Sequence, residues 1–122
     1  MSESTQQIHL IKWFKLQYPG KIIFSIPNAL KLGSRAGNKY AMLRNLKNEG
    51  LLKGVSDLFV PIPRGNYHGL FIELKNIGKT RCSVSEDQRW FIDEMRESGY
   101  RAEWAPGFDK AKEIITEYMK GR

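Results

Sequence analysis

The stretch that decides the fold is LFIELKN, residues 70–76, near the middle of the chain. Four of its first five residues are large and apolar, as in a buried strand, yet Glu73 and Lys75 stand within it. Alternate side chains of a strand share a face, so we expect both charged groups on one face, with Ile72 and Leu74 on the other. Charged groups are costly to bury unless they are paired or bind a metal. The stretch therefore raises the question of what stabilises this pair.

The sequence on either side predicts alternating helices and strands. Apolar periodicity, caps and turn residues predict helices over residues 3–17, 39–48, 86–98 and 108–119, and strands over residues 21–26, 57–62, 69–75 and 100–105. In the first helix Ile8, Ile11 and Phe14 have helical spacing, and in the second Tyr40, Leu43 and Leu46 share one face. Ser85 and Gln88 have the spacing of a capping box before the third helix. The order α-β-α-β-β-α-β-α indicates an α/β sandwich with a mixed sheet flanked by helices.

Length and composition indicate one domain over residues 1–122. The chain has 122 residues, 41% of them hydrophobic, which is enough for a core. No apolar run approaches the roughly 20 residues of a membrane helix, and residues 1–10 lack a secretory pattern. The single cysteine, Cys82, excludes an internal disulfide framework and fits a reducing interior, so we expect a cytoplasmic protein.

Positive charge is concentrated in residues 31–54. This segment has six bases against one acid, so it carries +5 of the formal net charge of +7. The six bases are Lys31, Arg35, Lys39, Arg44, Lys47 and Lys53. A localised basic segment favours a polyanion such as nucleic acid, and an ordinary solvated face is the alternative.

Asp57 and Glu73 are candidate metal ligands. Asp57 opens the strand before Glu73, so the two carboxylates can converge if the strands pair through the turn PRGNY, residues 63–67. Two close carboxylates repel each other, and Mg²⁺ or Mn²⁺, with the backbone carbonyl of Leu74 as a third ligand, would resolve that conflict. With Lys75 beside them, these groups suit phosphodiester hydrolysis. The alternative is a surface ion pair between Glu73 and Lys75.

The order of these motifs resembles a known nuclease superfamily. GVSD, residues 54–57, followed by ELK, residues 73–75, resembles the PD-(D/E)xK nucleases. The flanking GLLKGVSDLFVPIPRGNYHGLFIELKN and SEDQRWFIDEMRESGYRAEWAPGFDKA resemble the virus-type replication-repair nuclease (VRR-NUC) domain, in its stand-alone form of bacteriophages and bacteria. The resemblance implies a restriction-endonuclease-like core. Ser56 stands where the superfamily name implies proline, and we do not interpret this as inactivation.

The resemblance implies roles for individual residues. By position it makes Asp57 and Glu73 metal ligands, Lys75 the catalytic lysine and Gln88 a residue facing the site. It also implies an acidic residue from the first helix near the metal. Glu3 is the only acid available there, and Gln6 and Gln7 are polar alternatives.

The resemblance also implies a substrate and an assembly. Asn28 and Arg35 match positions that contact phosphate or the site. Stand-alone members of the family resemble homodimeric enzymes that resolve four-way (Holliday) junctions, so we expect a DNA endonuclease of that kind. A flap, nick or single-strand nuclease of the same fold, a non-catalytic nucleic-acid-binding module and a small structural protein are the alternatives.

Overall fold

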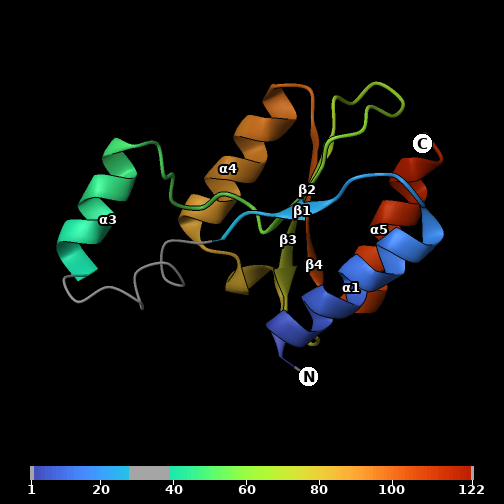
Figure 1. Ribbon diagram of the computed structural model, residues 1–122, viewed down its shortest axis with the longest axis horizontal. Helices are drawn as coiled ribbons and strands as arrows, with labels where there is room; N and C mark the ends of the chain where they lie inside the picture. The colour runs from blue at the N-terminus through green and yellow to red at the C-terminus, as the bar shows by residue number, and fades with distance from the viewer. Residues whose placement is uncertain (1, 28–38, 122) are drawn as a thin grey trace.

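The computed structural model describes residues 2–27 and 39–121 (Figure 1). The elements in chain order are α1 (Glu3–Gln17), β1 (Phe24–Ser25), α3 (Lys39–Asn48), β2 (Leu58–Val60), β3 (Leu70–Lys75), the short 3₁₀ helix η1 (Arg81–Ser83), α4 (Glu86–Glu97), β4 (Arg101–Pro106) and α5 (Phe108–Met119). This order confirms the predicted α/β arrangement, and the bounds of α1, α3 and α5 coincide with the predicted helices. None of the helices in the described part of the chain is long and apolar enough to span a membrane.

The four strands form one mixed sheet in the order β1-β2-β3-β4. β2 and β3 are antiparallel neighbours, with Leu58 opposite Ile72, so the predicted hairpin is confirmed. β4 runs parallel to β3 on its other side, and Glu73 is the partner of Trp104. β3 is therefore a central strand, and its six residues are buried or half-buried.

The strand predicted over residues 21–26 is much shorter than expected. Of residues 21–26, only Phe24 and Ser25 pair with β2. The N–H of Lys21 instead donates to the carbonyl of Tyr18, which completes the turn after α1. Pro27 follows Ile26 and ends the strand. β1 is thus a short edge strand.

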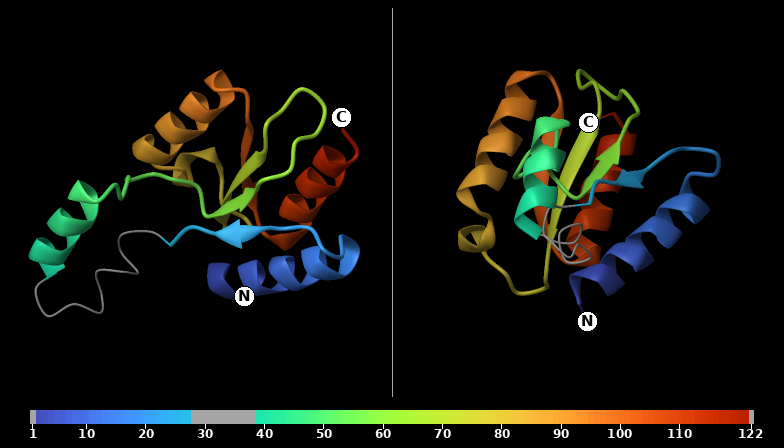
Figure 2. Two further views of the ribbon diagram at one scale, coloured as in Figure 1. Left: turned by 45° about the horizontal axis from the view of Figure 1, so that its top comes forward. Right: turned by 60° about the vertical axis from the view of Figure 1, so that its left-hand side comes forward.

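Helices cover both faces of the sheet (Figures 1 and 2). α1 and α5 lie side by side against one face, where Leu70, Ile72 and Leu74 of β3 join the larger core cluster. α4 covers the opposite face, where Phe71 packs with Phe91 in the second cluster. The alternation of β3 thus directs its leucines and Ile72 towards α1 and α5, and Glu73 and Lys75 towards the side of α4.

The buried face of α1 is shifted from the one that its apolar spacing suggested, since Phe14 is buried and Ile11 packs against the core as predicted but Ile8 does not. The buried residues are Gln6, Leu10 and Phe14, whereas Ile8 is half-exposed. The Oε1 of the buried Gln6 accepts a hydrogen bond of 2.8 Å from the N–H of Phe108, the first residue of α5. A polar side chain thereby caps a helix that has no cap of its own.

α3 stands apart from the sandwich in Figure 1 and in the left view of Figure 2, and in the right view it lies in front of the sheet. The apolar face predicted for it is only partly covered, because Leu43 and Leu46 are half-buried while Tyr40 is 85% exposed. A hollow of about 500 Å³ separates Leu43 and Lys47 from the loop of Gly54 and from Gln88.

Candidate active site

Asp57 and Glu73 come together at one end of the β2–β3 hairpin. Asp57 directly precedes β2, and its carbonyl accepts a hydrogen bond of 2.8 Å from the N–H of Ile26. Its Oδ2 accepts another, also of 2.8 Å, from the N–H of Leu74. The second bond ties the Asp57 side chain to the residue next to Glu73, so the two carboxyl groups that the sequence predicted to converge lie close together.

Glu73 is the buried member of the pair. It is 3% exposed, and its Oε1 has no hydrogen-bond partner among the described residues. Burial, and then the negative charge of Asp57 and a hydrogen bond with it, raise the pKa of Glu73 to about 9. Without a cation nearby, Glu73 is therefore protonated at neutral pH.

Lys75 and Glu3 act on Glu73 in opposite directions. The ammonium of Lys75, two residues along β3 on the same face, lowers the pKa of Glu73. Glu3, in the first turn of α1, raises it. The structure thus brings both predicted residues within electrostatic reach of Glu73. Gln6 engages its Oε1 in capping α5, while its Nε2 is buried without a partner among the described residues.

The acidic pair fits a divalent metal ion. In residues 2–27 and 39–121 no group of three or more His, Cys, Asp or Glu side chains is placed to hold a metal. A buried carboxylate oxygen without a partner, next to a second carboxylate, is nevertheless a donor set that a hard divalent cation satisfies. Asp57 and Glu73 could supply two ligands, and a backbone carbonyl and waters could supply the others.

Gln88 lies in the predicted capping box. Its Oε1 accepts a hydrogen bond from the N–H of Ser85, and its own N–H donates to Ser85 Oγ. Gly54 lies against the same first turn of α4, because a Cβ on it would come within 2.4 Å of the Asp87 carbonyl oxygen. Gln88 thus stands beside the loop that leads to Asp57, but its side-chain oxygen is engaged in capping.

The predicted DNA-binding residues divide into four groups. Asn28, Lys31 and Arg35 lie outside the described residues, and the structure describes only the backbone of Lys39. Arg44 and Lys47 are exposed on α3. Lys53 pairs with Asp87 at 3.3 Å, and since both side chains are solvent-accessible this ion pair contributes little to stability.

Three residues on the β4 side of Glu73 were not predicted from the sequence. Trp104 is opposite Glu73 in the sheet, and Arg81 and Arg89 line a hollow with it. No motif joins these three, since they come from η1, α4 and β4. The one available signal was the order strand, helix, strand over residues 69–105, which is compatible with a parallel pair that brings Trp104 next to Glu73.

The mixed sheet, its two helical layers and the acidic pair with its lysine define the class of protein: a nuclease fold of the PD-(D/E)xK superfamily. The VRR-NUC domain family matches residues 2–109, and the chain belongs to this family. It is similar to a solved structure described as a VRR_NUC domain protein, with a TM-score of 0.79 and 26% identity over 99% of this chain and 90% of that one. None of the curated proteins compared matches the chain. Family membership implies a nuclease and a DNA substrate.

Proposed function

We propose that the chain, acting as one nuclease domain, is a metal-dependent endonuclease that hydrolyses phosphodiester bonds in structured DNA. One observation carries this proposal: the Asp57–Glu73 pair has a buried oxygen with no partner among the described residues. An ordinary surface ion pair would leave both groups in water, but Glu73 is only 3% exposed. Burying an ionisable group without a partner costs free energy. The burial of Glu73 therefore favours a metal-binding role for the pair over the alternative of a small structural protein.

The chain would hold Mg²⁺ or Mn²⁺ through Asp57, Glu73 and the backbone carbonyl of Leu74, with Glu3 in reach of the site. When bound, such an ion activates water for attack and neutralises charge on a phosphate oxygen. The hydrogen bond from Leu74 keeps the Asp57 carboxylate in place before the ion arrives, so little reorganisation is needed.

Lys75 has a different task in this proposal. Its ammonium lies on the face of β3 that carries Glu73, and its side chain is only partly buried. It can donate a hydrogen bond to a non-bridging phosphate oxygen, where negative charge grows in the transition state. Its positive charge also favours the ionised form of Glu73.

We further propose that two copies act together on a four-way junction. Two symmetric cuts need two active sites related by a two-fold axis, and a 122-residue chain offers little surface to hold two duplexes. The exposed Arg44 and Lys47 of α3 can contact phosphates without reading sequence. Action in the cytoplasm of a bacterium or of a phage-infected cell belongs to the same proposal.

The test is cleavage of a labelled four-way junction with magnesium or manganese, comparing the wild type with Asp57→Asn. The proposal expects paired cuts by the wild type and none by the variant. Cleavage that survives Asp57→Asn would refute the assigned site. If the wild type cleaves a flap, a nicked duplex or a single strand in preference to the junction, that DNA is the substrate in place of the junction. If the wild type binds DNA but cleaves none with either metal, the protein is a non-catalytic binding module.

A further inference from the structure

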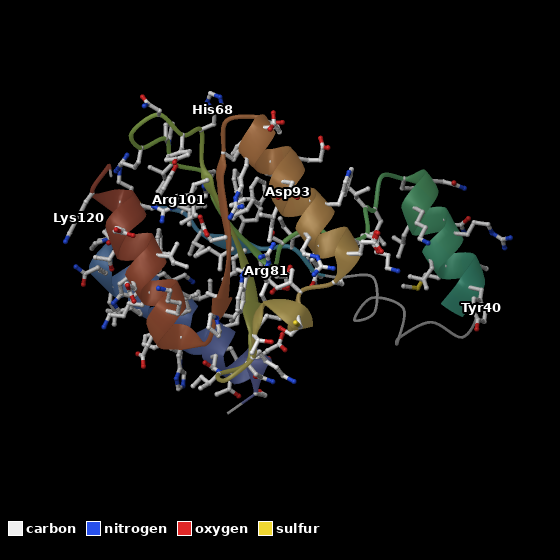
Figure 3. The ribbon with its side chains drawn as sticks, turned by 180° about the vertical axis from the view of Figure 1, so that it is seen from behind. Tyr40, His68, Arg81, Asp93, Arg101 and Lys120 are labelled. Atoms are coloured by element: carbon white, nitrogen blue, oxygen red, sulfur yellow. The ribbon has the colours of Figure 1, made fainter. Side chains whose placement is uncertain are left out.

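A second hollow lies on the other side of Glu73 from Asp57. Its volume is about 350 Å³, and it lies where η1, α4 and β4 meet. We call this hollow the arginine groove. The polar and aromatic residues that line it are Arg81, Arg89, Asp93, Arg96 and Trp104. Figure 3 shows the labelled Arg81 and Asp93 beside α4 and β4, on the side turned away in Figure 1.

The groove carries positive charge that the described part of the protein does not neutralise. Arg96 is engaged, since its Nε donates to the carbonyl of Ala102 at 2.9 Å and its guanidinium pairs with Glu103 at 3.3 Å. Arg81 and Arg89 are exposed, and within the described part of the chain neither forms an ion pair. Asp93 is the single acid in the lining against three arginines.

The register of the sheet places the groove next to the candidate active site. Glu73 and Trp104 are direct partners in the parallel β3–β4 pair, so their side chains share a face. β2, which follows Asp57, lies on the opposite side of β3. A nucleic-acid strand held at Glu73 could therefore reach the arginine groove over one strand spacing, about 5 Å.

We propose that the arginine groove is a second phosphate-binding subsite, which holds the DNA strand beside the bond to be cut. Arg81 and Arg89 would each donate paired hydrogen bonds to the oxygens of a phosphodiester, for which a planar guanidinium is well suited. Trp104 would supply an apolar wall for a sugar or an unpaired base. This inference rests on the proposed nuclease function and adds residues that the basic segment of α3 does not include.

The test is DNA binding without metal, which separates the groove from catalysis. Fluorescence anisotropy in EDTA would measure the affinity of a labelled single-stranded oligonucleotide and of a labelled four-way junction. Arg81→Gln and Arg89→Gln should each weaken binding about tenfold, the size of one charge-assisted hydrogen-bonded contact. Each should also lower the salt dependence on the single strand by about 0.7 in the log–log slope. Both arginines are exposed, so the variants should fold, which circular dichroism checks.

The matched control is the double variant Lys12→Gln/Lys15→Gln, which removes two exposed charges from the second half of α1. Its affinity should stay close to that of the wild type. An equal loss in the control would mean that only net charge matters, and unchanged binding in both arginine variants would exclude the groove; either result overturns the inference. If the arginine variants bind DNA more weakly but the wild type never cleaves DNA, the nuclease proposal alone is refuted. If cleavage depends on Asp57 but DNA binding is unchanged in the arginine variants, the proposal for the arginine groove alone is refuted.

Discussion

Oδ2 of Asp57 accepts a hydrogen bond of 2.8 Å from the backbone N–H of Leu74. The bond joins the residue before β2 to the strand that carries Glu73, at the end of the hairpin where β2 no longer pairs. It continues the contact between the two strands beyond their last paired residues. The bond therefore stabilises the end of the hairpin and also orients the Asp57 carboxylate. The fold and the acidic pair therefore depend on the same side chain.

Replacing Asp57 by asparagine should separate its two tasks. The amide oxygen of the new side chain can still accept from the Leu74 N–H, so the fold should persist, but the negative charge is lost. We expect cleavage to fall by more than about 100-fold and Mn²⁺ to stop raising the melting temperature. Asp109→Asn, an exposed carboxylate at the start of α5, is the control and should change neither reading. Retained stabilisation by Mn²⁺ in Asp57→Asn would contradict the metal assignment.

The burial of Glu73 should make the metal-free protein less stable as pH rises. The pKa of Glu73 is raised from 4.5 to about 9, so the folded chain keeps a proton that the unfolded chain loses. The resulting stabilisation is complete below about pH 4.5 and disappears as pH approaches about 9. Glu73→Gln cannot titrate, so it should lose this slope and be the more stable protein near pH 9. Urea unfolding of both proteins in EDTA across this range measures the difference, and parallel pH profiles would rule it out.

Lys75→Met should damage catalysis without preventing metal binding. Loss of one charged donor to the phosphate should slow cleavage by about 10²–10³-fold. Mn²⁺ should still raise the melting temperature, because the acidic pair remains and a repelling ammonium is gone. Lys79→Met, an exposed lysine beyond the end of β3, is the control. Full cleavage by Lys75→Met would show that the lysine only balances the charge of Glu73.

Variants of Gln88 should distinguish capping from a role in the site. Gln88→Ala loses the hydrogen bond from the Ser85 N–H and should cost about 1 kcal/mol in the free energy of unfolding. Gln88→Glu keeps the acceptor, so its stability should match the wild type. Its new negative charge should nevertheless weaken DNA cleavage if residue 88 faces the active site, as the family resemblance implies. Normal cleavage and stability in Gln88→Glu would restrict the residue to capping.

Gly54→Ala should disturb the loop that leads to Asp57. Gly54 has a φ of +94°, and a Cβ there would lie 2.4 Å from the carbonyl oxygen of Asp87. Gly50 has a comparable φ of +112° but open space around it, so Gly50→Ala is a matched control. Gly54→Ala should be less stable than Gly50→Ala by about 1–3 kcal/mol, because the loop must move away from α4. Equal stabilities in urea unfolding would show that the close approach is not needed.

The local elements were predictable because their signals lie within a few residues. The capping box of Ser85 and Gln88 and the extents of α1, α3 and α5 depend on neighbours in the chain. The hairpin followed from two apolar runs joined by a turn-rich link. β1 was predicted too long because the apolar run of residues 21–26 does not reveal that Lys21 belongs to a turn with Tyr18.

The candidate site was partly predictable for the same reason. Asp57 and Glu73 are joined by a short hairpin, so their order in the chain is enough to place them together. The contribution of Gln6 was not predictable, because its partner, Phe108, is 102 residues away. Trp104 likewise reaches Glu73 only through a parallel pairing that spans α4.

The amino-acid sequence by itself determined which strand carries the carboxylate and the lysine, and on which face, because strand alternation and hairpin pairing are local rules. It also determined, through the order of GVSD and ELK, the family to which the chain belongs. Only the tertiary structure decided that Glu73 is buried with an oxygen unpartnered among the described residues, that Gln6 caps α5, and that Trp104 of the arginine groove pairs with Glu73 in the sheet. Burial and contacts between distant segments arise when the layers pack against each other, and no short stretch of sequence contains both partners.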